Sequence, residues 1–184
     1  MRILMLGNSF IFTNDLPKIL ADLTGAEVVQ HTRGGARLSE QLNPATALGA
    51  CTQAALATER WDYVVLQEMR HGPITAPKSF FSSVSRLCAQ IRANGAVPVL
   101  YATWPYEKGG AALTKKGWDY DEMARGLQEA YHRAAEKNNA LLADVGERFC
   151  ALCTTQQLYA ADGVDPNEQG TRVAAETIAA VILQ

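Results

Sequence analysis

Several features of nucleic-acid-binding and membrane proteins are missing from this sequence. Lys and Arg total 17 and Asp and Glu total 19, which gives a net charge of −2. The chain therefore has no excess of positive charge with which to bind nucleic acid or an anionic membrane. No apolar run approaches the roughly 20 residues that a membrane-spanning helix needs. Repeats, low-complexity tracts and Pro/Gly/Ser-rich linkers are also absent. We expect neither a nucleic-acid nor a membrane partner.

Cysteine is scarce, with 4 residues in the chain, and only Cys150 and Cys153 form a Cys-x-x-Cys unit. A structural zinc site would need a second pair of Cys or His at suitable spacing, and there is none. The apolar run from Ile3 to Leu6 is too short for the core of a signal peptide. We expect a cytoplasmic location, reduced thiols, and no metal or organic cofactor.

Length and hydrophobic patterning indicate a globular α/β protein. The 184 residues correspond to one domain at about 150 residues per domain, so we predict a single domain over 1–184. Short, nearly continuous apolar runs bounded by turn residues are typical of strands buried on both faces. Five segments have this pattern: Arg2–Leu6, Glu27–His31, Tyr63–Gln67, Val97–Tyr101 and Leu141–Asp144.

Segments with helical patterns separate these apolar runs and follow the last of them. They are Asp15–Leu23, Pro44–Thr58, Ser79–Ala93, Asp119–Lys137 and Glu168–Leu183. Regular alternation of strand and helix predicts parallel strands joined by right-handed crossovers. The predicted fold class is α/β, a three-layer α/β/α sandwich with a five-stranded parallel sheet. In such sheets the active crevice lies outside the carboxyl ends of the strands.

Residues with catalytic potential follow these strands and precede the last helix. The segments are Gly7-Asn8-Ser9-Phe10, Arg33-Gly34-Gly35-Ala36, Gln67-Glu68-Met69-Arg70-His71, Thr103-Trp104-Pro105-Tyr106 and Asp162-Gly163-Val164-Asp165-Pro166-Asn167. A serine hydroxyl, a glycine pair and an amide side chain at one edge are the groups that acyl transfer needs. They supply a nucleophile and donors for an oxyanion.

The order of these segments resembles the SGNH (GDSL-type) hydrolase family of serine esterases, which has a flavodoxin-like α/β/α fold. The resemblance runs from residue 3 to residue 170 and implies that Ser9 is the nucleophile. Asn8 stands where Asp is commoner in the family. The resemblance also implies an oxyanion hole made by the N–H groups of Ser9 and Gly35. Gln67 occupies the place of the family's asparagine, whose amide donates to the oxyanion.

The final segment departs from the family pattern Asp-x-x-His-Pro. Asp162 matches the aspartate that orients the catalytic histidine, but Asp165 occupies the position of the histidine itself. Aspartate is a weak base with a reference pKa of about 3.9, although burial or a second carboxylate can raise the pKa. We therefore expect impaired activity. Asp165 could act as the base, or it could cap the last helix and have no catalytic role.

The other candidates are substrate contacts. His71 follows the third strand at the predicted site edge and could be a substitute base or a substrate contact, whereas His31 and His132 are expected to lie outside the site. Asn8 and Trp104 are further possible contacts, and an aromatic ring there would suit stacking on a sugar.

The leading functional hypothesis is hydrolysis of small acyl esters, including O-acetyl esters of carbohydrates. The alternative is a non-catalytic member of the same fold that binds a carbohydrate or acyl ligand. A phosphate or nucleotide binder is disfavoured, because the first loop lacks a glycine-rich cradle leading into a helix.

Overall fold

The centre of the protein is a five-stranded parallel sheet. The computed structural model describes residues 1–184, and the strand order is β2-β1-β3-β4-β5. Met5, in the central part of the sheet, pairs with Gln30 on one side and with Val65 on the other. The strands are β1 (Arg2–Gly7), β2 (Glu27–Thr32), β3 (Tyr63–Leu66), β4 (Val97–Tyr101) and β5 (Leu141–Ala143). The predicted α/β class and sheet are confirmed.

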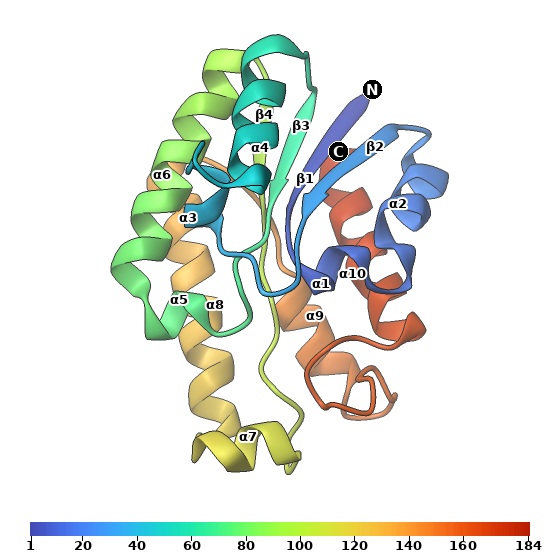
Figure 1. The fold of residues 1–184 in the computed structure, drawn as a ribbon. Helices are drawn as coiled ribbons and strands as arrows, with labels where there is room; N and C mark the ends of the chain where they lie inside the picture. Colours follow the sequence, from blue (N-terminus) through green and yellow to red (C-terminus); the bar gives the residue numbers. More distant parts are fainter.

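Helices cover both faces of this sheet (Figure 1). Ile3 and Met5 pack with residues of α2, α9 and α10, whereas Leu4 and Leu6 pack with residues of α4, α6 and α8. This alternation along one strand follows from the two-residue period of strands, and it explains why β1 is apolar throughout. The helices are α2 (Leu16–Thr24), α4 (Ala47–Thr58), α6 (Pro77–Asn94), α8 (Tyr120–Asn138), α9 (Val145–Leu152) and α10 (Glu168–Ile182). The predicted three-layer sandwich is confirmed.

Several short helices lie outside the predicted segments. They are α1 (Ser9–Phe12), the 3₁₀ helix η1 (Thr13–Asp15), α3 (Leu38–Gln41), α5 (Gly72–Thr75) and α7 (Ala111–Lys116). The eight-residue helix α9 was not predicted either. Such short helices span too few turns to leave a hydrophobic period in the sequence. Three of them begin at or next to residues of the candidate site described below. Ser9 is the first residue of α1, and Arg37 and His71 immediately precede α3 and α5.

The start of α10 differs from one sequence-based alternative. Asn167 is the N-cap of this helix, and its side chain accepts a hydrogen bond of 2.9 Å from the Gly170 N–H. The interpretation of Asp165 as a helix cap is therefore wrong. An N-cap side chain must lie directly before the first helical turn, and Asp165 lies two residues earlier and faces elsewhere.

The four cysteines are free thiols, and Cys150 and Cys153 lie on and just after α9. The Tyr120 hydroxyl lies 3.6 Å from the Cys153 sulfur. No group of three or more His, Cys, Asp or Glu side chains could hold a metal ion. None of the helices combines the length and the apolar character that crossing a membrane would require. Reduced thiols in solution remain a prediction.

Candidate active site

Ser9 lies at the carboxyl edge of the sheet, directly after a tight turn. The Asn8 side chain caps α1 by accepting a hydrogen bond of 3.3 Å from the Phe10 N–H. A Cβ atom on Gly7 would clash with Gln67 Oε1 and Ile11 Cδ1, so a larger residue at the end of β1 would displace these side chains. The turn leaves Ser9 with 9% of its surface exposed. Its hydroxyl is thus fixed in place and still reachable from solvent.

Asp165 contacts Ser9 directly. The Ser9 hydroxyl donates a hydrogen bond of 3.0 Å to Asp165 Oδ1, across 156 positions of sequence. The aspartate therefore makes the contact with the serine that the family resemblance assigns to a histidine. An aspartate side chain is shorter than a histidine side chain, so the loop must bring its backbone closer to Ser9 than an imidazole would require.

Asp162 shapes the loop that carries Asp165. Its Oδ1 atom accepts hydrogen bonds of 2.9 Å each from the backbone N–H groups of Val164 and Asp165. This is a local turn closed by an aspartate side chain, a common use of Asp in loops. Asp162, which was predicted to orient a catalytic base, thus contacts the backbone of Asp165.

The charge state of Asp165 depends on its surroundings. Burial raises the pKa of the Asp165 carboxyl above its usual range, and the nearby Asp162 carboxyl acts in the same direction. The hydrogen bond from Ser9 and the positive charge of Arg70 act in the opposite direction. Arg70 Nη2 lies 3.7 Å from Asp165 Oδ1. A raised pKa makes this carboxylate a better general base than an exposed aspartate.

Two backbone N–H groups are available as oxyanion donors. Gly35 adopts a left-handed conformation with φ of 68° after β2, and its N–H donates no hydrogen bond within the protein. The N–H of Ser9 belongs to the first turn of α1 and has no acceptor inside that helix. Asn8 Nδ2 donates a hydrogen bond of 3.1 Å to the Ala36 carbonyl, which ties the serine turn to the glycine turn.

The Gln67 side chain is buried, whereas the sequence analysis expected its amide to face the crevice as an oxyanion donor. It has 0% exposed surface. Its Oε1 atom accepts a 3.1 Å hydrogen bond from the Asn8 N–H, and its amide nitrogen donates to the Glu68 carbonyl. Since no atom of Gln67 reaches the surface, its amide supports the turn that carries Ser9. The sequence shows the amide after β3 but contains no signal for the direction in which it points.

His71 lies at the carboxyl edge, as expected, in an aromatic environment. Its Nδ1 atom lies 2.9 Å from the Thr75 hydroxyl. Its ring meets the rings of Trp118 and Tyr106 edge-on, with centroids 5.4 Å and 6.4 Å away. Burial, followed by the charges of Lys116, Arg37 and Arg70, lowers the pKa of His71. A neutral imidazole is therefore favoured there.

Trp104 does not reach the surface. It is 1% exposed and stacks between Phe10 and Phe149, with ring centroids 4.4 Å and 4.2 Å away. The aromatic ring predicted to meet a substrate is thus part of the core, and the half-buried Trp118 lies beside His71 instead. Apolar packing and substrate stacking use the same residue type, so the sequence alone does not separate them.

The other two histidines do not contact Ser9. His31 Nδ1 lies 3.1 Å from the Thr52 hydroxyl, and His132 pairs with Asp144. The residue that sequence reasoning missed is Arg70. Its position directly before His71, in the loop after β3, is the signal that could have identified it.

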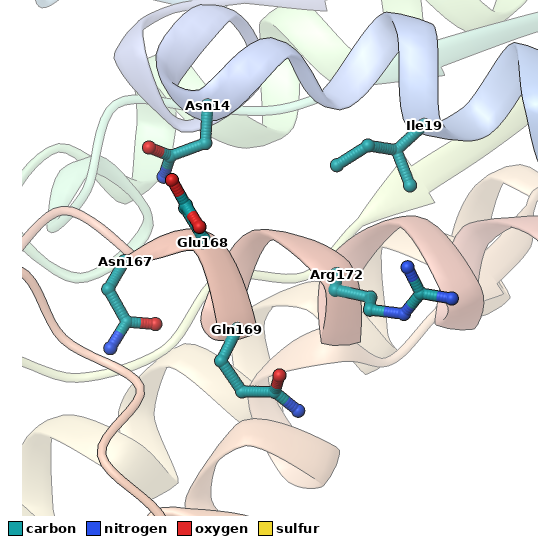
Figure 2. Close-up of a pocket in the computed structure, with 6 residues that line it drawn as sticks. All are labelled: Asn14, Ile19, Asn167, Glu168, Gln169 and Arg172. Atoms are coloured by element: carbon teal, nitrogen blue, oxygen red, sulfur yellow. The ribbon is translucent and has the colours of Figure 1, made fainter.

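A separate cavity of about 680 Å³ lies between α2 and α10 (Figure 2). Its lining is polar apart from Ile19, and it includes Asn14, Glu168 and Arg172. Asn14 Nδ2 donates hydrogen bonds to the Pro166 carbonyl and the Thr171 hydroxyl, at 3.0 Å and 2.9 Å. This cavity contains neither Ser9 nor Asp165.

Comparison with known proteins identifies the family. No model of a protein family matches the chain, and no curated protein does. A solved structure of a protein from Slackia heliotrinireducens, assigned to the SGNH hydrolases, is 52% identical to this chain. The match covers 98% of each chain with a TM-score of 0.94. The chain belongs to the SGNH hydrolase family.

More distant structures share the fold. An acetylxylan esterase from Geobacillus stearothermophilus is 14% identical over 98% of this chain and 93% of its own, with a TM-score of 0.68. Two structures of that esterase are catalytic mutants, in which a histidine or a serine is replaced by alanine. A lipolytic protein of the G-D-S-L family from Veillonella parvula is 13% identical over 100% and 99%, with a TM-score of 0.76.

Proposed function

We propose that this protein is a serine esterase that hydrolyses small acyl esters, including O-acetyl esters of carbohydrates. Ser9 is the nucleophile and Asp165 the general base. The observation that carries the proposal is the 3.0 Å hydrogen bond from the Ser9 hydroxyl to Asp165 Oδ1. That distance lies within the reach required for proton transfer between a nucleophile and its base.

The first half of the reaction is acylation of the serine. The Ser9 oxygen attacks the ester carbonyl carbon while its proton passes to the Asp165 carboxylate. The negative charge that develops on the carbonyl oxygen is stabilised by the N–H groups of Ser9 and Gly35. When the tetrahedral intermediate collapses, the protonated Asp165 returns its proton to the leaving alkoxide. An alcohol is released, and Ser9 carries the acyl group.

The second half is deacylation by water. The Asp165 carboxylate takes a proton from water, and the resulting nucleophile attacks the acyl carbon in the same oxyanion site. Collapse releases the acid and returns the proton to the Ser9 oxygen. Asp165 must be ionised at the start of both halves. Activity should therefore rise with pH through the pKa of Asp165, which is raised above that of an exposed carboxyl.

The second candidate function is binding of a carbohydrate or acyl ligand without turnover. The observation that favours it is the identity of the base, because a carboxylate is intrinsically a weaker base than imidazole. Removal of general-base catalysis costs a serine hydrolase about 100- to 10,000-fold. Under this alternative, Ser9 and Gly35 would only line a ligand crevice.

Labelling with a fluorophosphonate probe, together with hydrolysis of p-nitrophenyl acetate, tests the proposal. We expect covalent labelling of Ser9, detected by mass spectrometry of the modified peptide, and turnover that Ser9→Ala abolishes. Asp165→Asn keeps the shape of the side chain but removes the base, and should lower kcat by about 100-fold or more. Ligand binding without labelling or Ser9-dependent turnover would establish the second candidate.

A further inference from the structure

The groove beside the oxyanion glycine is polar and holds an unpartnered cation. It has a volume of about 530 Å³, begins at Gly35, and has no hydrophobic side chain in its lining. Two arginines line it. Arg33 is held by Glu40, at 2.9 Å from Nε to Oε1. The half-buried Arg37 has neither a hydrogen-bond acceptor for its guanidinium nor an ion-pair partner in the protein.

Another arginine, Arg70, lies next to Asp165, the proposed base. Arg70 lies 3.7 Å from Asp165 Oδ1, so its guanidinium has one long ionic contact and free donors. Arg37, Arg70 and Lys116 all act electrostatically on His71, which places the imidazole within reach of three positive charges. Lys116 itself lies over the ring of Trp118, at 5.3 Å.

Negative charge near these cations is limited. Glu68 is 2% exposed, and burial raises the pKa of its carboxyl, while its two oxygens accept hydrogen bonds from the Met69 and Leu38 N–H groups. Asp162 is turned to the backbone of its own loop, and Asp165 faces Ser9. Arg37 acts on the Glu68 carboxyl only at long range, and Glu40 in the same groove is paired with Arg33. The Arg37 guanidinium thus makes no hydrogen bond or ion pair with any carboxylate, which is unusual for a partly buried cation.

We infer that Arg37 and Arg70 bind a negatively charged group in the alcohol half of the ester substrate. The inference rests on the proposed function and specifies its substrate class as esters of anionic alcohols. The alcohol half is indicated because Asp165 must return its proton to the leaving oxygen, which therefore lies on the side of Arg70. Arginine presents several donors to a carboxylate and makes strong charge-assisted hydrogen bonds with it.

Binding to the Ser9→Ala protein tests this inference without requiring turnover. The probes are 4-acetoxybenzoate and its methyl ester, which share an acetyl group and differ in one charge. We expect the anion to bind at least about 10-fold more tightly in a titration followed by NMR, the effect of one or two hydrogen bonds to a charged group. The preference should weaken as salt is added.

Variants of the two arginines localise the effect. Arg37→Gln and Arg70→Gln, each in the Ser9→Ala protein, should remove most of the preference for the anion, and Arg37→Lys should retain part of it. Arg172→Gln, in the separate cavity between α2 and α10, is the matched control and should retain all of it. Equal affinity for both probes, or a preference that survives both glutamine variants, would overturn the inference.

The two proposals can fail separately. If the parent protein hydrolyses p-nitrophenyl acetate through Ser9 but the probes bind equally well, only the anionic substrate class is wrong. If the anion is preferred but no Ser9-dependent turnover occurs, the arginine site stands and the catalytic proposal fails.

Discussion

The segment from Asp162 to Glu168 has two sides of different character. On one side, Asp165 meets Ser9 and Arg70, close to the groove that begins at Gly35. On the other side, Asn167 and Glu168 line the cavity of about 680 Å³ between α2 and α10. This cavity is larger than the groove, but no nucleophile and base converge in it. We therefore place the proposed chemistry where Ser9 and Asp165 converge, and not in the larger cavity.

Two asparagines show the same difference between the Ser9 side and the cavity side. Asn8 caps α1, and Asn14 lies in η1. Asn8 is 1% exposed, and its side chain links the turn at Ser9 to the turn at Gly35, whereas the Asn14 side chain links η1 to the start of α10. Substitutions on the two sides should therefore separate effects on kcat from effects on stability.

The largest effect is expected from Asp165→His, which alters only the Ser9 side of the segment. An imidazole titrates near neutral pH and is a stronger base than a carboxylate, so hydrolysis of p-nitrophenyl acetate should rise, by at most the roughly 100- to 10,000-fold that general-base catalysis contributes. The gain should develop as pH rises through about 6 to 7. Ser9→Ala in the same background should abolish it. A folded Asp165→His protein without Ser9-dependent turnover would instead favour the ligand-binding function.

Gln67→Ala should reduce both stability and rate. It leaves the buried Asn8 N–H and the Glu68 carbonyl without partners, which should lower the free energy of unfolding by about 1–3 kcal/mol. Because the serine turn loses its support, we also expect kcat to fall, by less than the roughly 100-fold that a misplacement of about 1 Å can cost. A fall of 100-fold or more in kcat with unchanged urea denaturation would make Gln67 an oxyanion donor.

Asn14→Ala should act on stability with little effect on chemistry. It removes two hydrogen bonds and an asparagine from a left-handed position with φ of 54°, at a cost of about 2–3 kcal/mol in the free energy of unfolding. Urea denaturation and kcat, measured on the same preparation, check this. A loss of activity larger than the loss of stability would show that the two sides of the segment are coupled.

Asp165→Asn should make the protein more stable at neutral pH. Because the folded-state pKa of Asp165 is raised, the native state holds this proton more tightly than the unfolded chain does. Stability therefore falls as pH rises from the ordinary carboxyl range through the folded pKa. Asparagine lacks this charge, so the melting temperature of the variant should exceed that of the parent at pH 7. The difference should shrink toward pH 3, and a constant difference would contradict the assigned pKa.

The smallest effect is expected from Arg172→Gln. Arg172 lines the cavity between α2 and α10 and pairs with the half-buried Glu176 four residues on, which also pairs with Arg148. A surface pair of this kind contributes about 0.3–0.5 kcal/mol. Hydrolysis of p-nitrophenyl acetate should stay within about twofold of the parent rate, as expected for a residue remote from the reacting atoms. A larger change would bring that cavity into the catalytic site.

Much of the fold was predictable because it depends on local patterns. The apolar runs at Arg2–Leu6 and Val97–Tyr101 are continuous enough to indicate buried strands, and the observed bounds of these strands lie within one residue of the prediction. The segments flanking Ser9, Gly35 and Asp165 were identified by their place after strands and before the last helix. Parallel strands bring their carboxyl ends to one edge, so sequence order implies proximity.

The directions of individual side chains were not predictable. Gln67 and Trp104 were expected to face the crevice, and both are buried. Amides and aromatic rings serve cores and binding sites equally well, and only packing against Asn8 or Phe149 decides between them. Arg70 was missed because its contact with Asp165 joins two loops that are distant in sequence.

The sequence by itself determined the parallel sheet, its helical layers and the edge at which catalysis is proposed. The hydrophobic periodicity and the succession of strands and helices along the chain are properties of the sequence. The tertiary structure alone decided that Asp165 faces Ser9 rather than capping α10, and that Asn167 takes the capping role. In the sequence, a residue that caps a helix and a residue that faces the active site can both stand just before the helix. Which role each side chain takes depends on the direction in which the folded loop points it, and that direction is set by contacts across 156 residues.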